Sequence, residues 1–564
     1  MSNNRNYQIS TERIDDIVIL LSVMKQIGLP EIINQYLPRH GKEKGLDWGW
    51  VTVIWLSYIL SRGDHRKVKV RDWVDQRSYT LETVCGLDLK ETDFTDDRLG
   101  ILLRRLSQTE TWSRIETHLS QESIRVYSLP TQQIRIDATT NSGYHQVSEE
   151  GLFQFGKSKD DPNLPQIKTM MASLDPLGMP LATLVVSGEN ADDGLYLPAF
   201  EQVTSTLNEP ELLCVGDCKM SAIQTRASIH CAHHYYLTPL SRVGTVPQQL
   251  EEWIAQAQKG SLESIQITRS LENGTSKFLG TGYELEREQK TILNGKTQTW
   301  TERVFLIRSQ SYLETQIRGL HQRLKTAQDK LFALTPVVGR GKRQVREEEE
   351  LCQKAEGILR HHRVEGLLHY TYDYEVPTRH RAGRYQITAV TSNKSAIKQV
   401  EQQLGWRAYV TNAPKERLSL PQGLLTYRDE WIAERSFHRL KGVPLSLSPF
   451  FVQRDDQVQG LVHLLSLAVR LLTLIEFVVR RDLKASGESL VGLYPGNPKK
   501  ATQQPTAEKI LEAFENLTVT LFEIRGNSYA HVCELNSLQQ QIIRCLGLSP
   551  EIYAGLVDSS LVSL

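Results

Sequence analysis

The sequence predicts an α/β protein whose mixed-sheet core is interrupted by an α+β insertion domain, between an all-α N-terminal region and a mostly helical C-terminal region. Three observations lead to this fold class. Residues 11–129 carry apolar side chains at the three- and four-residue spacing of amphipathic helices. After Pro130 the apolar spacing changes to that of β-strands. Beyond residue 241, charged strands and long charged helices replace this pattern.

Length and composition restrict the class of protein further. A chain of 564 residues is too long for one core, so we expect several domains. Its 66 Lys and Arg balance its 66 Asp and Glu, so any attraction to nucleic acid must come from local patches. The seven cysteines are scattered and odd in number, which favours a reducing, cytoplasmic location.

One segment is apolar enough to raise the question of a membrane. The stretch "VQGLVHLLSLAVRLLTLIEFVVRR" is interrupted by His463, Arg470 and Glu476, which a lipid-facing helix would tolerate poorly. The N-terminal residues are polar and lack a hydrophobic signal core. We therefore expect this helix to be buried in protein and the chain to have no membrane partner.

The N-terminal domain, residues 1–129, is predicted to be helical and to bind DNA or mediate dimerisation. Its helices lie in "IDDIVILLSVMKQIGLPEIINQYL", "WGWVTVIWLSYILSRG" and "DDRLGILLRRLSQTETWSRIETHL". The basic stretch "DHRKVKVRDW" is explained equally well by a solvated surface.

The sheet core is predicted in two parts. Residues 130–240 hold the strands "QQIRIDATT", "IKTMMASL", "MPLATLVVSG", "ELLCVG" and "HYYLTPL", with helices before and after "ELLCVG". Residues 241–380 form the insertion, with three strands followed by two charged helices. Residues 381–482 return to the core through "GRYQITAVTSN", "LGWRAYVTNAP" and the helix "TYRDEWIAERSFHRLKG". Residues 483–564 form a linker and a helical C-terminal region.

Three acids stand where a mixed sheet would bring them together. Asp137 lies near the end of one strand, Asp217 directly follows a strand buried on both faces, and Glu434 lies on a helix after another strand. Each could equally be an ordinary turn or cap acid. That alternative is weaker for Asp217, because a run as apolar as "LLCV" seldom ends in a carboxylate without a reason.

Such acids could hold divalent metal ions. Carboxylates bind Mg²⁺, and a pair of metal ions suits phosphodiester chemistry because it can activate the attacking oxygen and stabilise the leaving one. Without metal ions the acids would repel one another. We expect two Mg²⁺ ions, with Mn²⁺ as a substitute.

Two other patterns suggest ligands but have simpler explanations. "GLFQFGKS" matches the phosphate-loop pattern, yet it runs into "KDDPNLP", whose Pro162 and Pro165 oppose the helix that a phosphate loop needs. A zinc site would draw on side chains near the fourth core strand, but no paired CxxC motif exists there. These side chains are Cys214, Cys218, His230, Cys231, His233 and His234. The basic loops "GRGKRQVR" and "TRHRAGR" could contact phosphates or be solvated.

Five segments together resemble a known family. "IRIDATT", "GKSKDDPNLPQ", "GMPLATLVVSGENADD", "LLCVGDCKMS" and "YRDEWIAERSFHRLKG" resemble the DDE transposases of bacterial insertion sequences, in the branch with a Y-R-E-K signature and a strand-rich insertion domain. The resemblance extends over residues 133–478. It implies an RNase H-like core and a cytoplasmic bacterial enzyme, associated with the nucleoid when it acts. Such an enzyme cuts DNA at terminal inverted repeats and joins the freed 3′-OH to target double-stranded DNA, as a homodimer on DNA.

The resemblance also implies roles for individual residues. Asp137, Asp217 and Glu434 correspond to the catalytic metal ligands, and the signature spacing is matched by Tyr427, Glu434 and Lys441. Tyr427 and Lys441 would hold DNA phosphates. The signature Arg is replaced by Glu430, and Arg428 or Arg435 could take its DNA-binding role. Two further family motifs correspond to Ser158, Lys159, Asp160, Pro162 and Leu164, and to Gly188 and Asn190.

Two alternatives to a transposase stay open. An inactive or host-adopted relative would bind DNA without cutting it, and Glu430 at the Arg position supports this alternative. A metal-dependent nuclease would cut DNA without joining strands.

Overall fold

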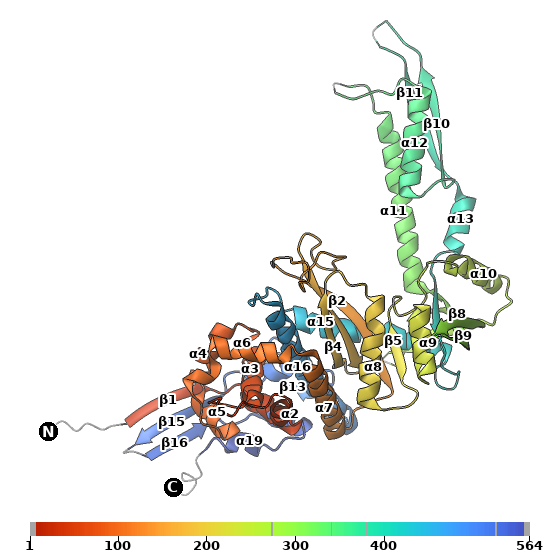
Figure 1. The fold of residues 1–564 in the computed structure, drawn as a ribbon. Helices are drawn as coiled ribbons and strands as arrows, with labels where there is room; N and C mark the ends of the chain where they lie inside the picture. Colours follow the sequence, from red (N-terminus) through yellow and green to blue (C-terminus); the bar gives the residue numbers. More distant parts are fainter. Residues whose placement is uncertain (1–6, 272–273, 340, 380, 525–526, 558–564) are drawn as a thin grey trace. The chain divides into compact units, whose positions relative to one another are not determined.

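The computed structural model describes residues 7–271, 274–339, 341–379, 381–524 and 527–557 (Figure 1). The chain forms two compact units. Unit 1 comprises Met1–Tyr236, Thr291–Gln298 and Tyr427–Leu564, and unit 2 comprises Leu237–Lys290 and Thr299–Thr426.

The first part of unit 1 is helical, as predicted. Its α-helices are α1 (Ile17–Gln26), α2 (Leu29–Tyr36), α3 (Trp48–Arg62), α4 (Val70–Asp75), α5 (Ser78–Cys85), α6 (Asp96–Leu106) and α7 (Thr109–Tyr127). They enclose a core that includes the fully buried Trp55. Thr95 caps the N-terminus of α6, because its hydroxyl accepts a hydrogen bond from the amide of Arg98.

The two ends of the described chain share a sheet that the sequence analysis did not predict. Strand β1 (Tyr7–Arg13) pairs with β15 (Thr518–Ile524), which pairs with β16 (Asn527–Val532), and both pairings are antiparallel. The C-terminal region was predicted to be mostly helical. Helices α17 (Ala507–Glu512), α18 (Ser537–Cys545) and α19 (Glu551–Ala554) agree with that prediction, but the β15–β16 hairpin differs because its partner strand comes from the other end of the chain.

The central sheet of unit 1 contains β2 (Gln133–Ser142), β3 (Gln166–Leu174), β4 (Met179–Ser187) and β5 (Leu213–Gly216), in the order β4-β3-β2-β5. Neighbouring strands of β4-β3-β2 are antiparallel, whereas β2 and β5 are parallel. Every residue of β3 and β5 is buried, which explains their long apolar runs. The sheet is therefore mixed, as predicted.

Four helices pack on this sheet. Helix α8 (Tyr196–Leu207) packs on β3 and β4, and α7 and α16 (Asp455–Ser486) also contact β4. Helix α15 (Trp431–Lys441) contacts β2 and α16. Helix α16 is long and apolar enough to span a membrane by length and composition, but its most apolar window is 94% buried inside the protein. The prediction that this helix is buried in protein is confirmed.

Unit 2 has a sheet and an arm. The sheet order is β6-β12-β9-β8-β7, from β6 (Tyr235–Pro239), β12 (Trp406–Thr411), β9 (Lys296–Ser309), β8 (Ser276–Leu293) and β7 (Ile265–Ser270). Strand β12 is antiparallel to both β6 and β9. Three further helices lie in this part of the chain, namely α10 (Val246–Gln258), α13 (Lys394–Gln402) and α14 (Leu420–Arg428), and α9 (Ile223–Cys231) precedes β6 in unit 1.

The arm consists of α11 (Gln310–Leu334), α12 (Glu348–His362), β10 (Leu368–Glu375) and β11 (Arg384–Ser392) (Figure 1). It has a core of its own, in which Leu331 and Leu359 of the helices accompany Ile387 and Val390 of β11. The strand pattern of the sequence predicts that residues from 381 onward belong to the sheet core. Strand β11 instead pairs with β10, because its apolar side chains complete the core of the arm.

Candidate active site

Strand register brings Asp137 and Asp217 to the same level of the sheet. Strands β2 and β5 are parallel neighbours, and Ile136 is the partner of Gly216. Asp137 directly follows Ile136, and Asp217 directly follows Gly216. Because neighbouring strands lie only about 4.8 Å apart, the two carboxylates emerge side by side. The structure therefore brings together two of the three predicted acids.

The carboxylate of Asp217 is held in place by two hydrogen bonds. The Tyr196 hydroxyl donates to Oδ1 at 2.6 Å, and the amide of Lys219 donates to the same oxygen at 2.8 Å. Tyr196 is buried, and burial together with the charges of Asp217 and Asp137 raises its pKa well above the usual value. The phenol therefore stays protonated and acts as a donor. Sequence reasoning missed Tyr196, because nothing in the surrounding "GLYLPAF" distinguishes it from a core aromatic residue.

Asp137 carries a strongly perturbed carboxyl group. Burial, together with the charges of Asp217 and Glu430, raises its pKa to about 7, although Lys159 and the amide of Ala138 oppose this rise. The Lys159 ammonium group donates to the carbonyl oxygen of Ala138 at 2.8 Å, which places a cation beside the carboxylate. A perturbed acid next to other acids is a common feature of functional sites.

Glu430, rather than the predicted Glu434, contributes to raising the pKa of Asp137, after burial and Asp217. It also contributes to raising the pKa of the Cys218 thiol, after burial and Asp217. Glu430 precedes the first turn of α15, and Glu434 lies one turn further on, with an exposed side chain. A separation of four residues keeps both acids on one side of the helix. The role of Glu434 as a metal ligand stays a prediction.

Lys441 lies on the same side of α15, seven residues after Glu434. Its ammonium group donates to Thr139 Oγ1 at 3.0 Å and pairs with Asp160 Oδ1 at 2.8 Å. Thr139 follows Asp137 by two residues on β2, so Lys441 reaches the strand that carries the first acid. The remaining predicted DNA ligands near this helix are Tyr427, which is buried, and Arg428, which is half-buried at the end of α14.

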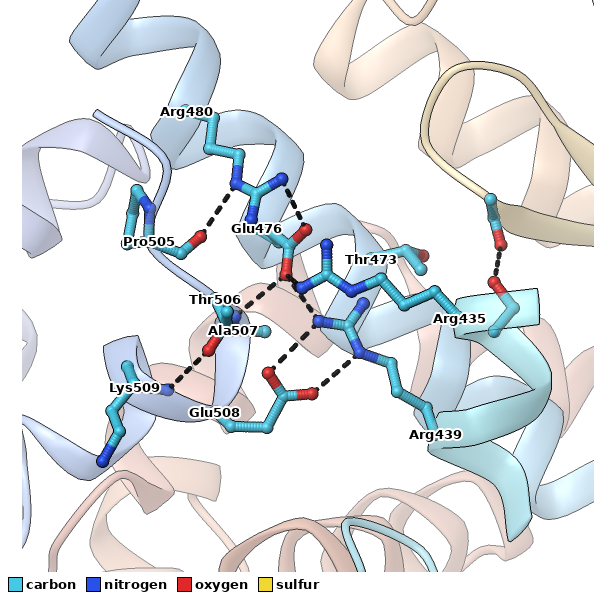
Figure 2. Close-up of polar contacts among 12 residues, drawn as sticks. Arg435, Arg439, Thr473, Glu476, Arg480, Pro505, Thr506, Ala507, Glu508 and Lys509 are labelled. Carbon is cyan, nitrogen blue, oxygen red and sulfur yellow. Dashed lines mark hydrogen bonds and ion pairs between the residues drawn. The ribbon is translucent and has the colours of Figure 1, made fainter. Parts of the chain in front are cut away.

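Arg435 was also predicted to contact DNA, but its guanidinium group is engaged within the protein. It pairs with Glu476 of α16, which also accepts hydrogen bonds from Arg439 at 2.5 Å and Arg480 at 2.9 Å (Figure 2). Arg439 is buried and bridges to Glu508 at 2.8 Å. Burial opposes its charge, but hydrogen bonds to Glu508 and Glu476 outweigh burial and raise the pKa of Arg439. We call these five residues the arginine–glutamate cluster. It fastens α15 to α16 and α17.

The two further motifs of the resemblance lie in loops near the end of β2, where Ser142 pairs with Gln166. Ser158 contacts Ser142 at 3.2 Å between the hydroxyl oxygens, and the amide of Lys159 donates to Thr140 Oγ1 at 2.9 Å. Gly188 permits a close chain crossing, because a Cβ there would lie 2.1 Å from the Gln166 carbonyl oxygen. These contacts attach the loop of Lys159 to the end of β2.

The two alternative ligand sites are not formed by the described residues. The described segment that follows "GLFQFGKS" is not helical; Gln154 instead makes an isolated bridge with Gln166, and Phe153 is buried against His145. Cys214 is buried in β5, where burial raises the pKa of its thiol and so opposes the thiolate that zinc requires. Within the described part of the chain, no group of three His, Cys, Asp or Glu side chains is arranged to hold a metal ion.

The residues of the site nevertheless fit Mg²⁺ better than zinc. Mg²⁺ is commonly bound through one or two carboxylates and keeps several waters. Asp137 and Asp217 provide two neighbouring carboxylates. The pKa of Asp137 is raised by burial first and by the charges of Asp217 and Glu430 in addition, and a bound divalent cation would offset both causes. The donor set is therefore suited to a hard cation.

Comparison with known proteins adds little to this geometry. No protein-family model and no curated protein matches the chain. Among solved structures, the chain is similar to the cryo-EM structure of a piggyBac transposase synaptic complex with hairpin DNA. The TM-score is 0.34 and the sequence identity 8%, over 98% of this chain and 89% of that chain. A TM-score of this size does not establish a shared fold, so the function has to be inferred from the residues of the site.

Proposed function

We propose that the protein is a Mg²⁺-dependent DNA transposase with an RNase H-like core, which cleaves at terminal inverted repeats and transfers the 3′-OH to target DNA. The observation that carries this proposal is the juxtaposition of Asp137 and Asp217 on parallel neighbouring strands, with Lys159 and Lys441 beside them. Carboxylates for metal ions and amines for phosphates are what phosphodiester chemistry requires.

Each residue of the site has a role in this proposal. Asp137, Asp217 and Glu434 would hold two Mg²⁺ ions, or Mn²⁺ in their place. The bound ions would supply an activated attacking oxygen and stabilise the leaving one. Tyr196 keeps the Asp217 carboxylate oriented through its 2.6 Å hydrogen bond. Lys441 would exchange its contact with Asp160 for a DNA phosphate, with Tyr427 and Arg428 as further DNA ligands.

Glu434 is kept as the third carboxylate because residues on both sides of it reach the site. Glu430, one turn before it, contributes to raising the pKa of Asp137. Lys441, seven residues after it, contacts β2. Glu430 would be an additional acid at the position where the resembling family has Arg. An acid at this position would add negative charge to the site, which favours the binding of metal ions and disfavours contact with a phosphate.

The experiment is an assay of labelled terminal-repeat DNA, of the element that encodes the protein, with Mg²⁺. The wild-type protein should nick the DNA and join it to a target plasmid, and a chelator should abolish both steps. Asp137→Asn should also abolish both, although Asn still accepts the hydrogen bond from the Ala138 amide. Asp88→Asn is the matched control, because the Asp88 side chain is 85% exposed and outside the site.

Each outcome has a distinct meaning. Nicking without joining would indicate a nuclease, and binding without nicking would indicate a DNA-binding relative. Full activity of Asp137→Asn would refute the proposed site. Glu434→Gln and Glu430→Gln are then compared: loss of nicking in the first and retention in the second supports Glu434 as the ligand, and the reverse result assigns that role to Glu430.

A further inference from the structure

The far end of the arm presents a concentrated positive charge. We define the basic tip as the described residues of 336–346 and 375–385, which form the loops at the end of the arm opposite the unit 2 sheet (Figure 1). Its exposed cationic side chains are Lys342, Arg343, Arg346, Arg379 and Arg381. Helix α11 leads to the tip over 25 residues, a distance of about 37 Å at 1.5 Å per residue.

The two loops of the basic tip are fixed to each other by one arginine. Arg384 pairs with Glu375 at 2.6 Å within its own hairpin. The same guanidinium group donates to the Pro336 carbonyl oxygen at 3.0 Å and to Gln344 Oε1 at 2.7 Å in the other loop. The Arg384 side chain is only 9% exposed. The buried Arg384 guanidinium group, with its several hydrogen bonds, thus holds together two loops that are about 40 residues apart in the sequence.

A backbone contact and a close ring contact complete this junction. The amide of Tyr385 donates to the Val345 carbonyl oxygen at 2.9 Å. Gly383 admits the Tyr374 hydroxyl, since a Cβ there would lie 2.1 Å from that oxygen. The loops are therefore organised before any ligand arrives, which reduces the entropy lost on binding.

The protein itself neutralises little of this charge. Arg343 pairs with Glu350, but the other four exposed cationic side chains of the tip have no salt-bridge partner among the described residues. Two of the glutamates that begin α12 have other partners as well: Glu350 also pairs with Lys354, and Glu348 accepts from the Tyr372 hydroxyl at 2.6 Å. Acids at a helix N-terminus also stabilise the helix dipole.

Apolar side chains stand among these cations. Val337 is 75% exposed and Val376 is 71% exposed, one in each loop. Exposed valines in the same loops as the cations suit a ligand that offers both phosphates and apolar sugar edges.

We propose that the basic tip binds the phosphate backbone of double-stranded DNA through Lys342, Arg346, Arg379 and Arg381, as a site separate from the catalytic carboxylates. The proposal rests on the proposed function, because it requires that the substrate is DNA. Contacts to phosphates carry no sequence information, so the tip would position DNA without selecting its sequence.

The test is the salt dependence of DNA affinity, measured by fluorescence anisotropy with the full-length protein, a labelled duplex of mixed sequence and no divalent metal. The test variant is Arg379→Ala/Arg381→Ala, and the matched control is Lys394→Ala/Lys398→Ala. The control removes the same charge from exposed positions on α13 in the same unit. Neither pair belongs to a buried core.

Two phosphate contacts contribute about 1.8 to the slope of log affinity against log salt. The affinity of the wild-type protein should therefore fall about twelvefold more than that of Arg379→Ala/Arg381→Ala between about 50 and 200 mM salt. The control should keep the wild-type slope.

A test variant with the same slope and affinity as the control would overturn the proposal for the tip while leaving DNA as the substrate. If the wild-type protein does not bind DNA at all, the proposed function fails as well. Nicking by the test variant on saturating DNA should be unchanged, which separates the tip from the catalytic site. Arg384→Gln provides a second measurement: it should lower DNA affinity and speed proteolysis within the two loops, and unchanged values of both would contradict the junction described above.

Discussion

Replacing Glu476 with glutamine should loosen helix α15, which carries Glu434 and Lys441 of the candidate active site. The Glu476 carboxylate accepts hydrogen bonds from three arginines and from the amide of Ala507 at 3.1 Å (Figure 2). Two of these arginines, Arg435 and Arg439, belong to α15. A glutamine side chain at this position would keep the shape and one acceptor oxygen but would lose the negative charge. The substitution therefore tests the charge of the arginine–glutamate cluster rather than its packing.

The expected magnitude follows from burial. The Glu476 side chain is 8% exposed and that of Arg439 is 3% exposed, so Arg439 would keep only Glu508 as a charged partner. Removing one partner of a buried ion pair costs about 3–5 kcal/mol. Arg435 and Arg480 are 25% and 21% exposed and can regain water. We therefore expect Glu476→Gln to lower the free energy of unfolding by about 3 kcal/mol, at the low end of this range.

Urea unfolding followed by tryptophan fluorescence measures this change, with Glu508→Gln as the matched control. The Glu508 side chain is 36% exposed and, among the described residues, its ion pair is with Arg439, so its loss should cost about 1 kcal/mol. Nicking of DNA by Glu476→Gln should fall in parallel, because α15 is no longer fixed to α16. A loss below about 1 kcal/mol for Glu476→Gln, or equal losses for both variants, would refute the role given to the cluster.

Two further predictions concern the packing and the pH dependence of unit 1. Gly460→Ala should destabilise the protein by about 3 kcal/mol or more, because its Cβ would lie 1.9 Å from the Leu103 carbonyl oxygen on α6. Gly357→Ala, with nothing within 4 Å, should be neutral or stabilising, and equal urea midpoints for the two variants would contradict the close approach. Burial raises the pKa of Asp16 to about 6, so the folded state holds its proton at pH values where the unfolded state has lost it. The wild-type protein should therefore lose about 2 kcal/mol relative to Asp16→Asn as the pH rises from about 4 to 7, and a constant difference in unfolding free energy would contradict the shift.

Local sequence patterns were sufficient for the elements that carry the two aspartates. The alternation in "QQIRIDATT" and the apolar run "ELLCVG" predict β2 and β5, because strand formation follows side-chain period and burial. The acid at the end of each run predicted where the carboxylates would stand. The helix that carries Glu434 and Lys441 has an apolar stripe of the helical period, in which Phe437 and Leu440 are buried.

Strand pairing between distant segments could not be predicted in the same way. The β1–β15 pair joins residues more than 500 positions apart, and β11 carries the same period-two pattern as a strand of the sheet core. Which sheet a strand joins depends on the partner edge and the apolar surface that the rest of the fold offers, so the pattern alone led to the wrong sheet for β11.

The charges of "TYRDEWIAERSFHRLKG" show most clearly what the sequence determined and what the tertiary structure decided. The sequence by itself determined an amphipathic helix with too many like charges for local pairing to balance. The tertiary structure decided the partners: Arg435 and Arg439 pair with Glu476, Arg439 also pairs with Glu508, and Lys441 pairs with Asp160. It also placed Glu430 within electrostatic reach of Asp137. The physical reason is that an ion pair needs two groups within a few ångströms, and for residues 37 to 281 positions apart only the packing of the folded chain sets that distance.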